Sequence, residues 1–459
     1  MIVIELFAGV GGFRLGLEGY KPDAKSPHYS LIRGFKKGQV KTRLLNEGYF
    51  ITGVANQYEP STKSAQHAAD IYSNRFKDNT LINEDINDVS AEKFLNTIQQ
   101  NIPDSRHDEN IMLVGGFPCQ DYSVAGRKDL SKGMQGKKGV LWWNIFNLIW
   151  DLKKLKRQPS LVLLENVDRL LKSPAQKRGK DFTILTLCLH YLGYDVEYKV
   201  VNGGDYGFPQ RRKRVFIMAN LRSTRLKDNI LASAFPQKQV MLLNSEKVFK
   251  ENLNLTDLEN LLFDYSNKKK IKFADFGNYG KLINGTLHTY KVKALYTGKR
   301  YALKDILQRE KIDGCVDDEF FVSNDELEKW EIAKGASKIT RRGLNRDTGQ
   351  KDFVYNYSVG KMSTFDELHK PIRTIITSEG GKAPSRTKHL IKIENDEMGK
   401  FRSGMRRLTP LEMERANCFP DNFTKLKPVG DARRAFIMGN ALIIGLVELI
   451  RNSIIENLE

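Results

Sequence analysis

The sequence predicts an α/β protein with a mostly parallel sheet and a second, irregular domain later in the chain. Three observations support this class. Over about the first 220 residues, short apolar runs alternate with turns and with amphipathic or polar helical patterns. The alternation ends near Leu221, and regular patterns return only after about residue 404. Alternating strands and helices are typical of a parallel sheet covered by helices on both faces.

The expected strands are short apolar runs that end in unusual residues. The runs lie at 1–7, 50–58, 110–117, 160–167, 195–203 and 214–221, and helical patterns follow at 14–20, 64–76 and 182–194. The strand ends carry Phe7, Gln57-Tyr58, Cys119 and Glu165. In open α/β sheets, ligand sites form beyond the carboxyl ends of the strands, so we expect these groups to converge.

The rest of the chain predicts a second domain and a return to the first. Residues 222–403 are rich in lysine and aromatic residues and show no sustained period. A final apolar helix is expected over 432–454. We therefore expect a catalytic domain at 1–221, completed by 430–459, a second domain at 222–403 and a hinge at 404–429. The basic, Gly/Pro-punctuated stretch 21–41 is expected to be a surface loop.

The charge of the chain favours a polyanionic partner. The 459 residues include 74 Lys+Arg against 55 Asp+Glu, which gives a formal net charge of +19. Such a surplus attracts nucleic acid, although a generally basic protein would show it as well.

The cysteines and the apolar runs point to the cytoplasm. Cys119, Cys188, Cys315 and Cys418 lie far apart and in no C-x-x-C spacing. We therefore expect neither a disulfide framework nor a metal site. We also expect the protein to reside in a reducing compartment. The apolar start is too short for a signal peptide, and no run is expected to reach membrane-spanning length. No membrane partner is predicted.

Glycines lie where the first strand turns into a helix. Gly9, Gly11 and Gly12 stand between the two patterns. Glycines there let the backbone approach a ligand, and the helix N-terminus supplies N–H donors. The spacing is not the dinucleotide fingerprint, so a cofactor site and a plain tight turn both remain open from this pattern.

The stretch VGGFPCQDYSVAG, residues 114–126, places a thiol at the end of an apolar strand, before polar and flexible residues. A structural cysteine usually lies inside an apolar run, as Cys188 does. A reactive cysteine acts as a thiolate and needs neighbours that lower its pKa. The candidate helpers for Cys119 are Glu165-Asn166 and the basic cluster at 210–214. Taken alone, Glu165 is better explained as a helix cap or a salt-bridge partner.

Six motifs, in order along the chain, resemble those of the DNA (cytosine-5)-methyltransferase family of bacterial restriction-modification type. ELFAGVGGFRLGLE (5–18) resembles its first motif, which binds S-adenosyl-L-methionine (AdoMet), and GGFPCQDYSVAG (115–126) its Pro-Cys motif. ENV (165–167), GDYGFPQRRKRVF (204–216), RRLTPLEMERANCFPDNF (406–423) and FIMGNALIIGLVE (436–448) match the other four. The resemblance covers most of 1–220 and 404–455. It implies an AdoMet-dependent, Rossmann-like fold with a target-recognition domain at 222–403.

The resemblance implies methyl transfer from AdoMet to C5 of a cytosine flipped out of a specific duplex DNA sequence. Cytosine C5 is a poor nucleophile, and addition of a thiolate at C6 makes it electron-rich. Cys119 matches the thiol that adds. Glu165 matches the residue that binds cytosine N3, Arg214 the one that reaches O2, and Arg212 a supporting residue.

The same resemblance implies binding residues. Those expected to bind AdoMet are Phe7, Gly9, Gly11, Gly12, Gln57, Tyr58, Asp85, Ile86, Pro118, Asn440 and Ala441. Those expected to bind DNA are Ser123, Arg127, Gln210 and Thr374. Residues 126–139 fit a lid that closes over the flipped base. One departure is Gln57, where the family commonly has an acidic residue on the ribose hydroxyls; Glu59 is the alternative.

Three functions are compatible with the motifs. The first is a DNA cytosine-C5 methyltransferase that acts as a monomer on double-stranded DNA, with a cognate restriction endonuclease in the same system. The second is an RNA (tRNA) cytosine-C5 methyltransferase, although the RNA-directed branch has a shorter middle region. The third is a catalytically inactive DNA-binding scaffold, which would have no need of Cys119, Glu165 and Arg214.

Overall fold

The computed structural model describes residues 1–19, 48–62, 65–117, 141–224, 229–268, 271, 273–335, 339–343, 353–357, 362–384, 387–394 and 400–458. The expected surface loop at 21–41 therefore lies outside the described residues. So do residues 118–140, which include Pro118, Cys119, Ser123, Arg127 and the expected lid.

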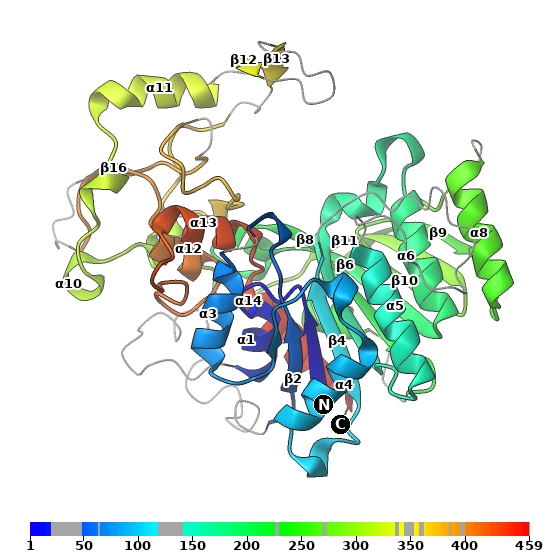
Figure 1. Cartoon of the computed structure of the whole chain (residues 1–459). Helices are drawn as coiled ribbons and strands as arrows, with labels where there is room; N and C mark the ends of the chain where they lie inside the picture. Colours follow the sequence, from blue (N-terminus) through cyan, green and yellow to red (C-terminus); the bar gives the residue numbers. More distant parts are fainter. Residues whose placement is uncertain are drawn as a thin grey trace.

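A ten-stranded sheet forms the centre of the molecule, in the order β3-β2-β1-β4-β5-β8-β6-β10-β11-β9 (Figure 1). Its first five strands are parallel: β3 (Leu81–Ile82), β2 (Ile51–Asn56), β1 (Ile2–Leu6), β4 (Ile111–Gly116) and β5 (Leu161–Val167). The other five each run antiparallel to the neighbour before them: β8 (Lys213–Leu221), β6 (Tyr194–Asn202), β10 (Tyr279–Ile283), β11 (Thr286–Ala294) and β9 (Gln237–Lys247).

The predicted α/β class is confirmed, and the sheet is mixed where it was expected to be mostly parallel. The antiparallel half contains residues 237–294, a stretch for which no regular structure was expected. One cause is a two-residue turn, Asn284-Gly285, in which both residues have positive φ angles (47° and 78°) and which joins β10 directly to β11. Asn-Gly is the preferred sequence for such a hairpin turn.

Helices cover both faces of the sheet because consecutive residues of the central strands are apolar and point to opposite faces. In β5, Leu161 and Leu163 belong to one buried cluster, and Val162 and Leu164 to the other. The first cluster packs under helices α1 (Gly12–Glu18), α7 (Ile230–Ala234) and α14 (Ile444–Leu458). The second packs under α4 (Ala91–Asn101), α5 (Leu141–Lys154), α6 (Lys180–Tyr191) and α8 (Leu255–Asn267). Helix α3 (His67–Phe76) lies beside α1 in Figure 1.

The expected single helix at the end of the chain is divided in two. Helix α13 (Asp431–Asn440) ends before Ala441, and α14 begins at Ile444. Helix α14 packs closely on α1, since a Cβ at Gly16 would lie 2.5 Å from Val447. Among the described residues, Asp431–Asn457 is the stretch whose length and hydropathy (1.4) would allow a membrane span, although none was expected. Since 72% of that window is buried inside the protein, it serves as core.

The remaining α-helices and strands lie outside the ten-stranded sheet. They are α9 (Leu303–Ile306), α10 (Glu310–Asp313), α11 (Asn324–Gly335), α12 (Pro410–Ala416), and the strand pairs β12 (Ile339–Gly343) with β13 (Phe353–Tyr357), β7 (Gln210–Arg211) with β14 (Ile372–Arg373), and β15 (Ile391–Ile393) with β16 (Gly404–Arg406). Helix α11 and the β12–β13 pair are drawn well away from the sheet (Figure 1). The division into catalytic and target-recognition domains stays a prediction.

Candidate active site at the carboxyl edge of the sheet

The register of the central strands brings three predicted positions to one edge, those of Phe7, Glu165 and Arg214. Strands β1 and β4 end in step, with Leu6 opposite Gly115, and Gly116 lies opposite Glu165 of β5. Strand β8 begins at this edge because it runs antiparallel to β5, which places Arg214 opposite Val167. The residues after β1 and β4, the carboxylate of Glu165 and the guanidinium of Arg214 therefore lie on the same edge, as expected from the alternation.

Glu165 and Arg214 form an ion pair there. Glu165 Oε1 lies 2.7 Å from Arg214 Nε, and their side chains are 12% and 16% exposed. The contact lacks hydrogen-bond geometry, so Oε1 has no hydrogen-bond partner among the described residues. A Cβ at Gly116 would lie 3.3 Å from Glu165 Oε2, so glycine at 116 leaves the carboxylate room. The pair places an acceptor and a cation, both mostly buried, side by side at this edge.

Asn166 fixes the backbone just before the predicted nucleophile. Its Nδ2 donates to the carbonyl oxygen of Phe117 at 2.9 Å, and its Oδ1 accepts from Val167 N at 2.8 Å. The Phe117 ring lies 6.1 Å from that of Trp142, near the start of α5. Phe117 directly precedes residues 118–140 and Trp142 lies two positions after them, so the chain on the two sides of that segment comes close together, with Phe117 next to Gly116, which pairs with Glu165. The motif ENV identified Asn166 as a candidate, but it did not predict that Asn166 contacts Phe117.

Arg212 is buried below the edge and does not face it. Its Nη1 donates to Ile375 O at 3.2 Å, and Nη2 donates to Gly439 O at 3.0 Å and Asn440 O at 3.2 Å. Burial, with the nearby Arg214, lowers the pKa of Arg212 to about 9. Arg212 thus ties the start of β8 to the end of α13, which is the arrangement expected of a supporting residue.

The expectation that Gln210 binds DNA does not fit this structure. Gln210 is fully buried. Its Nε2 donates to Asn417 Oδ1 at 2.8 Å, and its Oε1 accepts from Ile375 N at 3.1 Å. Both ends of the amide are used inside the protein because β7 pairs with β14, so DNA has no access to them. Thr374 is half-buried, and its hydroxyl donates to Arg211 O at 2.8 Å.

The glycine-rich turn after β1 is shaped by positive φ angles. Phe7, Gly9 and Gly11 have φ values of 53°, 56° and 85°. A Cβ at Gly11 would lie 2.4 Å from the Phe76 ring, whereas a Cβ at Gly9 would meet nothing within 4 Å. Gly9 N donates to Gln57 Oε1 at 2.8 Å. The turn is therefore closed against α3 at Gly11 and open at Gly9, beside Gln57. An open cradle at that position fits a bound cofactor.

Glu5 holds the start of α1 beneath this turn, although sequence analysis did not select it. Its Oε1 accepts from Phe13 N at 3.1 Å and Arg14 N at 3.3 Å. Burial raises the pKa of Glu5 to about 8 against the lowering effect of these donors. The sequence feature that could have identified Glu5 is a carboxylate inside the apolar run IVIEL.

The other predicted cofactor residues border the same edge. Tyr58 and Asp85 are half-buried, Ile86 is buried, Asn440 is exposed and Ala441 is half-buried. Asp85 Oδ1 accepts from Asn87 N at 3.0 Å as a helix cap. A Cβ at Gly12 would lie 3.2 Å from Leu442, so the first turn of α1 adjoins the segment after Asn440. Glu59 pairs with Arg433 of α13, so one of its carboxylate oxygens is already engaged.

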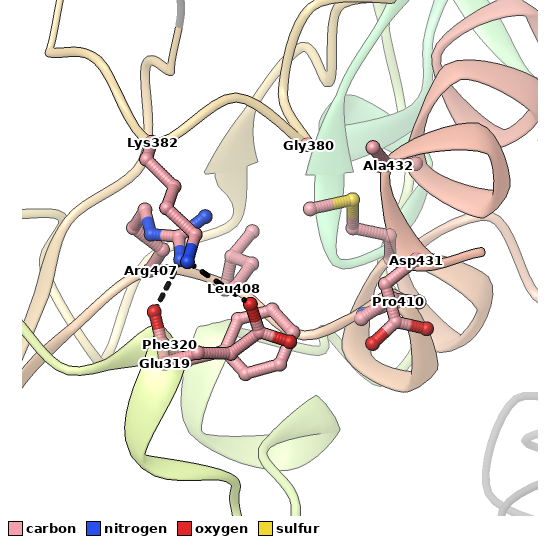
Figure 2. Close-up of a pocket in the computed structure, with 11 residues that line it drawn as sticks. Glu319, Phe320, Gly380, Lys382, Arg407, Leu408, Pro410, Asp431 and Ala432 are labelled. Atoms are coloured by element: carbon pink, nitrogen blue, oxygen red, sulfur yellow. Dashed lines mark hydrogen bonds and ion pairs between the residues drawn. The ribbon is translucent and has the colours of Figure 1, made fainter.

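A cavity of about 210 Å³ lies elsewhere, between the ends of α12 and α13 and two segments of the middle region (Figure 2). Figure 2 shows Arg407 and Lys382 on one side, facing Glu319, and Asp431 and Pro410 on the other. None of the predicted site residues lines it. It is therefore separate from the Glu165–Arg214 edge.

The fold and the edge define an α/β enzyme with a Rossmann-like sheet and a ligand site at its strand ends. The sequence model of the family described as C-5 cytosine-specific DNA methylase matches residues 1–456, and the chain belongs to this family. The predicted enzyme class, a DNA (cytosine-5)-methyltransferase of the type II restriction-modification kind, is thereby confirmed. The family acts on DNA and implies AdoMet as the methyl donor.

Individual relatives agree with this assignment. The chain is 37% identical to Type II methyltransferase M.Sau3AI of Staphylococcus aureus, over 98% of this chain and 95% of that protein. It is 29% identical to Type II methyltransferase M.Bsp6I of Bacillus sp. (strain RFL6), over 58% of this chain and 64% of that protein. Two solved structures share the fold. Entamoeba histolytica methyltransferase EhMeth matches with a TM-score of 0.54 and 14% sequence identity, over 100% of this chain and 99% of that chain. A Spodoptera frugiperda DNMT2 mutant matches with a TM-score of 0.55 and 12% identity, over 99% of both chains.

Proposed function

We propose that this enzyme methylates C5 of a cytosine that is flipped out of a specific duplex DNA sequence, through a transient bond between Cys119 Sγ and cytosine C6. The contact of Asn166 with Phe117 carries the proposal. Phe117 is held beside Glu165, and two residues of chain span at most about 7 Å. This short connection supports a role for Cys119 on a base that contacts Glu165 and Arg214.

The chemistry assigns each side chain an atom of the cytosine ring. The Cys119 thiolate adds to C6, and the electron pair moves toward C5 and N3. Glu165 in its acid form donates its O–H to N3 as negative charge develops there, and Arg214 donates to O2. AdoMet supplies an electrophilic methyl group on a sulfonium, which C5 takes up. Removal of the C5 proton, with an ordered water as base, then restores the double bond and expels the thiolate. Arg212 supports this arrangement from below without contacting the base.

The proposed AdoMet site lies at the open part of the glycine turn. Phe7, Gly9, Gly11 and Gly12 form the cradle, with Tyr58 on the adenine ring and Asp85 near its amino group. Ile86, Pro118, Asn440 and Ala441 complete the list of residues proposed to line it. Because Gln57 Oε1 already accepts from Gly9 N, the amide Nε2 is the group of Gln57 left to donate to the ribose. Glu59, which pairs with Arg433, is the less suitable candidate.

Base flipping requires that the DNA be held while one base leaves the stack, at a cost of a few kcal/mol. We assign Ser123 and Arg127 to DNA contact and residues 126–139 to a lid, on the basis of their composition. Thr374 is assigned to the DNA backbone, and 222–403 to base recognition. The enzyme would act as a monomer on cytoplasmic DNA, beside a cognate endonuclease.

DNA that carries 5-fluorocytosine at the target tests this mechanism directly. Fluorine at C5 cannot leave as a proton does, so the protein should remain attached to the DNA after methyl transfer. We expect an AdoMet-dependent covalent complex for the wild type and none for Cys119→Ser, which should still bind DNA. An equal amount of complex with the serine variant would exclude Cys119 as the nucleophile, and methylation of tRNA alone would exclude the DNA target.

A further inference from the structure

A loop from the middle of the chain lies on the same edge as the catalytic pair. Strands β8, β6, β10 and β11 alternate in direction, with Arg214 opposite Val201 and Tyr279 opposite both Lys199 and Tyr290. Strand β11 therefore ends, at Ala294, on the edge where β8 begins. Residues 295–301 follow directly and contain the sequence YTGKRY from Tyr296 to Tyr301.

This loop is fastened to the turn η7 (Gly203–Tyr206), which follows β6. Tyr301 N donates to Gly207 O at 2.9 Å, and Arg300 Nη1 donates to Gly204 O at 3.1 Å. Gly207 has φ 87°, and a Cβ there would lie 2.4 Å from Lys299 O. The loop is thus packed against a turn that belongs to the catalytic motif 204–216.

Contacts continue from η7 to the catalytic arginine. A Cβ at Gly204 would lie 3.1 Å from Arg211 Cγ, so Arg211 adjoins the turn that Arg300 binds. Arg214 Nη1 in turn donates to Lys213 O at 2.7 Å. Lys299, Arg300, Arg211 and Lys213 are all exposed. We call these four residues the basic track; it leads from the loop to Arg214 along the edge of the sheet.

The four cations of the track are exposed to an external anion, although Arg300 also donates to the backbone carbonyls of Gly204 and Tyr296. None of them forms an ion pair with a carboxylate among the residues that the structure describes. The nearest acidic side chain on η7 is Asp205, which is exposed and accepts from Asn202 Nδ2 at 3.1 Å. Aromatic rings support the loop cations, with Lys299 Nζ 4.8 Å from the Tyr301 ring centre and Arg300 Cζ 5.5 Å from that of Tyr296. Cation–π contacts of this kind hold a side chain without neutralising its charge.

We propose that the basic track binds the phosphate backbone of duplex DNA on one flank of the target cytosine. This inference rests on the proposed function, because Arg214 marks where the flipped base would lie. Strands β5 and β6 are two strand spacings apart, about 10 Å. The track therefore begins beside the catalytic pair and extends outward, as a DNA strand that leaves the site would. Phosphate contacts hold the register of the duplex and carry no sequence information.

The salt dependence of DNA binding tests the track. Each lost phosphate contact should reduce the slope of log K against log salt by about 0.9. We expect that reduction for Lys299→Ala and for Lys213→Ala, equally on target and non-target duplexes, and recovery in Lys299→Arg. Lys154→Ala is the matched control, since Lys154 is exposed at the end of α5, on the opposite edge, and should leave the slope unchanged.

Two outcomes would overturn the proposal that the basic track binds DNA phosphates. Both can be distinguished from failure of the catalytic mechanism. One is that Lys299→Ala and Lys213→Ala have the slope of Lys154→Ala. The other is that their slopes change with tRNA as the ligand and not with duplex DNA. Covalent trapping on 5-fluorocytosine DNA is measured in parallel at low salt. Normal trapping with unchanged slopes rejects the track alone, whereas changed slopes without any trapping by the wild type reject the mechanism and leave the track in place.

Discussion

Asn166 on β5 donates a hydrogen bond of 2.9 Å to the carbonyl oxygen of Phe117, the residue that follows β4. The two strands are parallel neighbours, so the bond spans the edge at which Glu165 also lies. It fixes the carbonyl two residues before Cys119, and Asn166 itself is buried. Asn166 is therefore a positioning residue of the proposed site.

Replacement of Asn166 should slow methyl transfer more than it weakens cofactor binding. Asn166→Ala leaves the carbonyl of Phe117 without its donor, at a cost of about 1–3 kcal/mol. We expect a slower single-turnover methylation rate with an unchanged AdoMet affinity, and the same for Asn166→Asp, which keeps the acceptor but loses the donor. Asn101→Ala, at the end of α4, is the control. A proportional loss of AdoMet binding would show that Asn166 only stabilises the fold.

Replacement of Glu165 tests the proposed hydrogen bond to cytosine N3. Glu165→Gln keeps the shape of the side chain but removes its charge, and loss of such an acid–base group typically costs about 10²–10⁴-fold in rate. Because the two side chains are only 12% and 16% exposed, loss of the ion pair should also lower the unfolding temperature, so the rate is measured at a temperature where the variant is fully folded. Asp205→Asn removes an exposed carboxylate of η7 and serves as the control. A rate close to that of the wild type would remove Glu165 from the mechanism.

The parallel half of the sheet could be predicted from the sequence because its signals are local. Each strand is an apolar run, and each end carries its site residue, so one rule of topology brings Phe7 and Glu165 to one edge. In the antiparallel half, β6 and β8 were predicted as strands at 195–203 and 214–221, whereas β9, β10 and β11 were missed, in part because β9 and β11 are only partly buried. The Asn284-Gly285 turn was nevertheless a readable hairpin signal.

Side-chain partners were the part that sequence could not supply. Gln210 was expected to face DNA, but the pairing of β7 with β14 buries it between Asn417 and Ile375. That pairing joins segments more than 160 residues apart, and no local pattern encodes it. The break between α13 and α14 was missed for a related reason. The apolar pattern continues through residues 441–443, and only packing against Gly12 distinguishes Leu442 from a helical residue.

Alanine substitutions at Gly9 and at Gly11 should have different effects on protein stability and on AdoMet binding. Alanine at Gly9 or at Gly11 must adopt a positive φ angle, which costs about 1–2 kcal/mol in either case. Alanine at Gly11 also meets the Phe76 ring at 2.4 Å, whereas alanine at Gly9 projects into open space. We expect Gly11→Ala to lower the unfolding temperature more, and Gly9→Ala to weaken AdoMet binding more. Calorimetry of unfolding and of AdoMet binding separates the two effects; equal AdoMet affinity in Gly9→Ala and wild type would contradict the proposed cradle.

The stability of the middle region should depend on pH through a buried ion pair. His389 Nδ1 lies 2.8 Å from Glu379 Oε1, and both side chains are fully buried. Burial opposes the charged ring, but the Glu379 carboxylate outweighs it and raises the pKa of His389, with Asp366 adding to the effect and Arg373 opposing it. Burial likewise opposes the carboxylate, but His389 lowers the pKa of Glu379.

The sign of the effect follows from these two shifts. A histidine whose pKa is raised on folding stabilises the fold below its unfolded pKa of about 6.5, and this contribution is lost as pH rises through the folded value. A glutamate whose pKa is lowered contributes above its unfolded pKa of about 4.3, and this is lost as pH falls through its folded value. Urea unfolding of a variant that keeps Trp330 as its single tryptophan, followed by fluorescence, should therefore show greatest stability between these limits; Trp330 packs in one cluster with Leu390, the neighbour of His389 in the chain. In His389→Gln the decline on the alkaline side should disappear; an unchanged alkaline decline would assign it to another group.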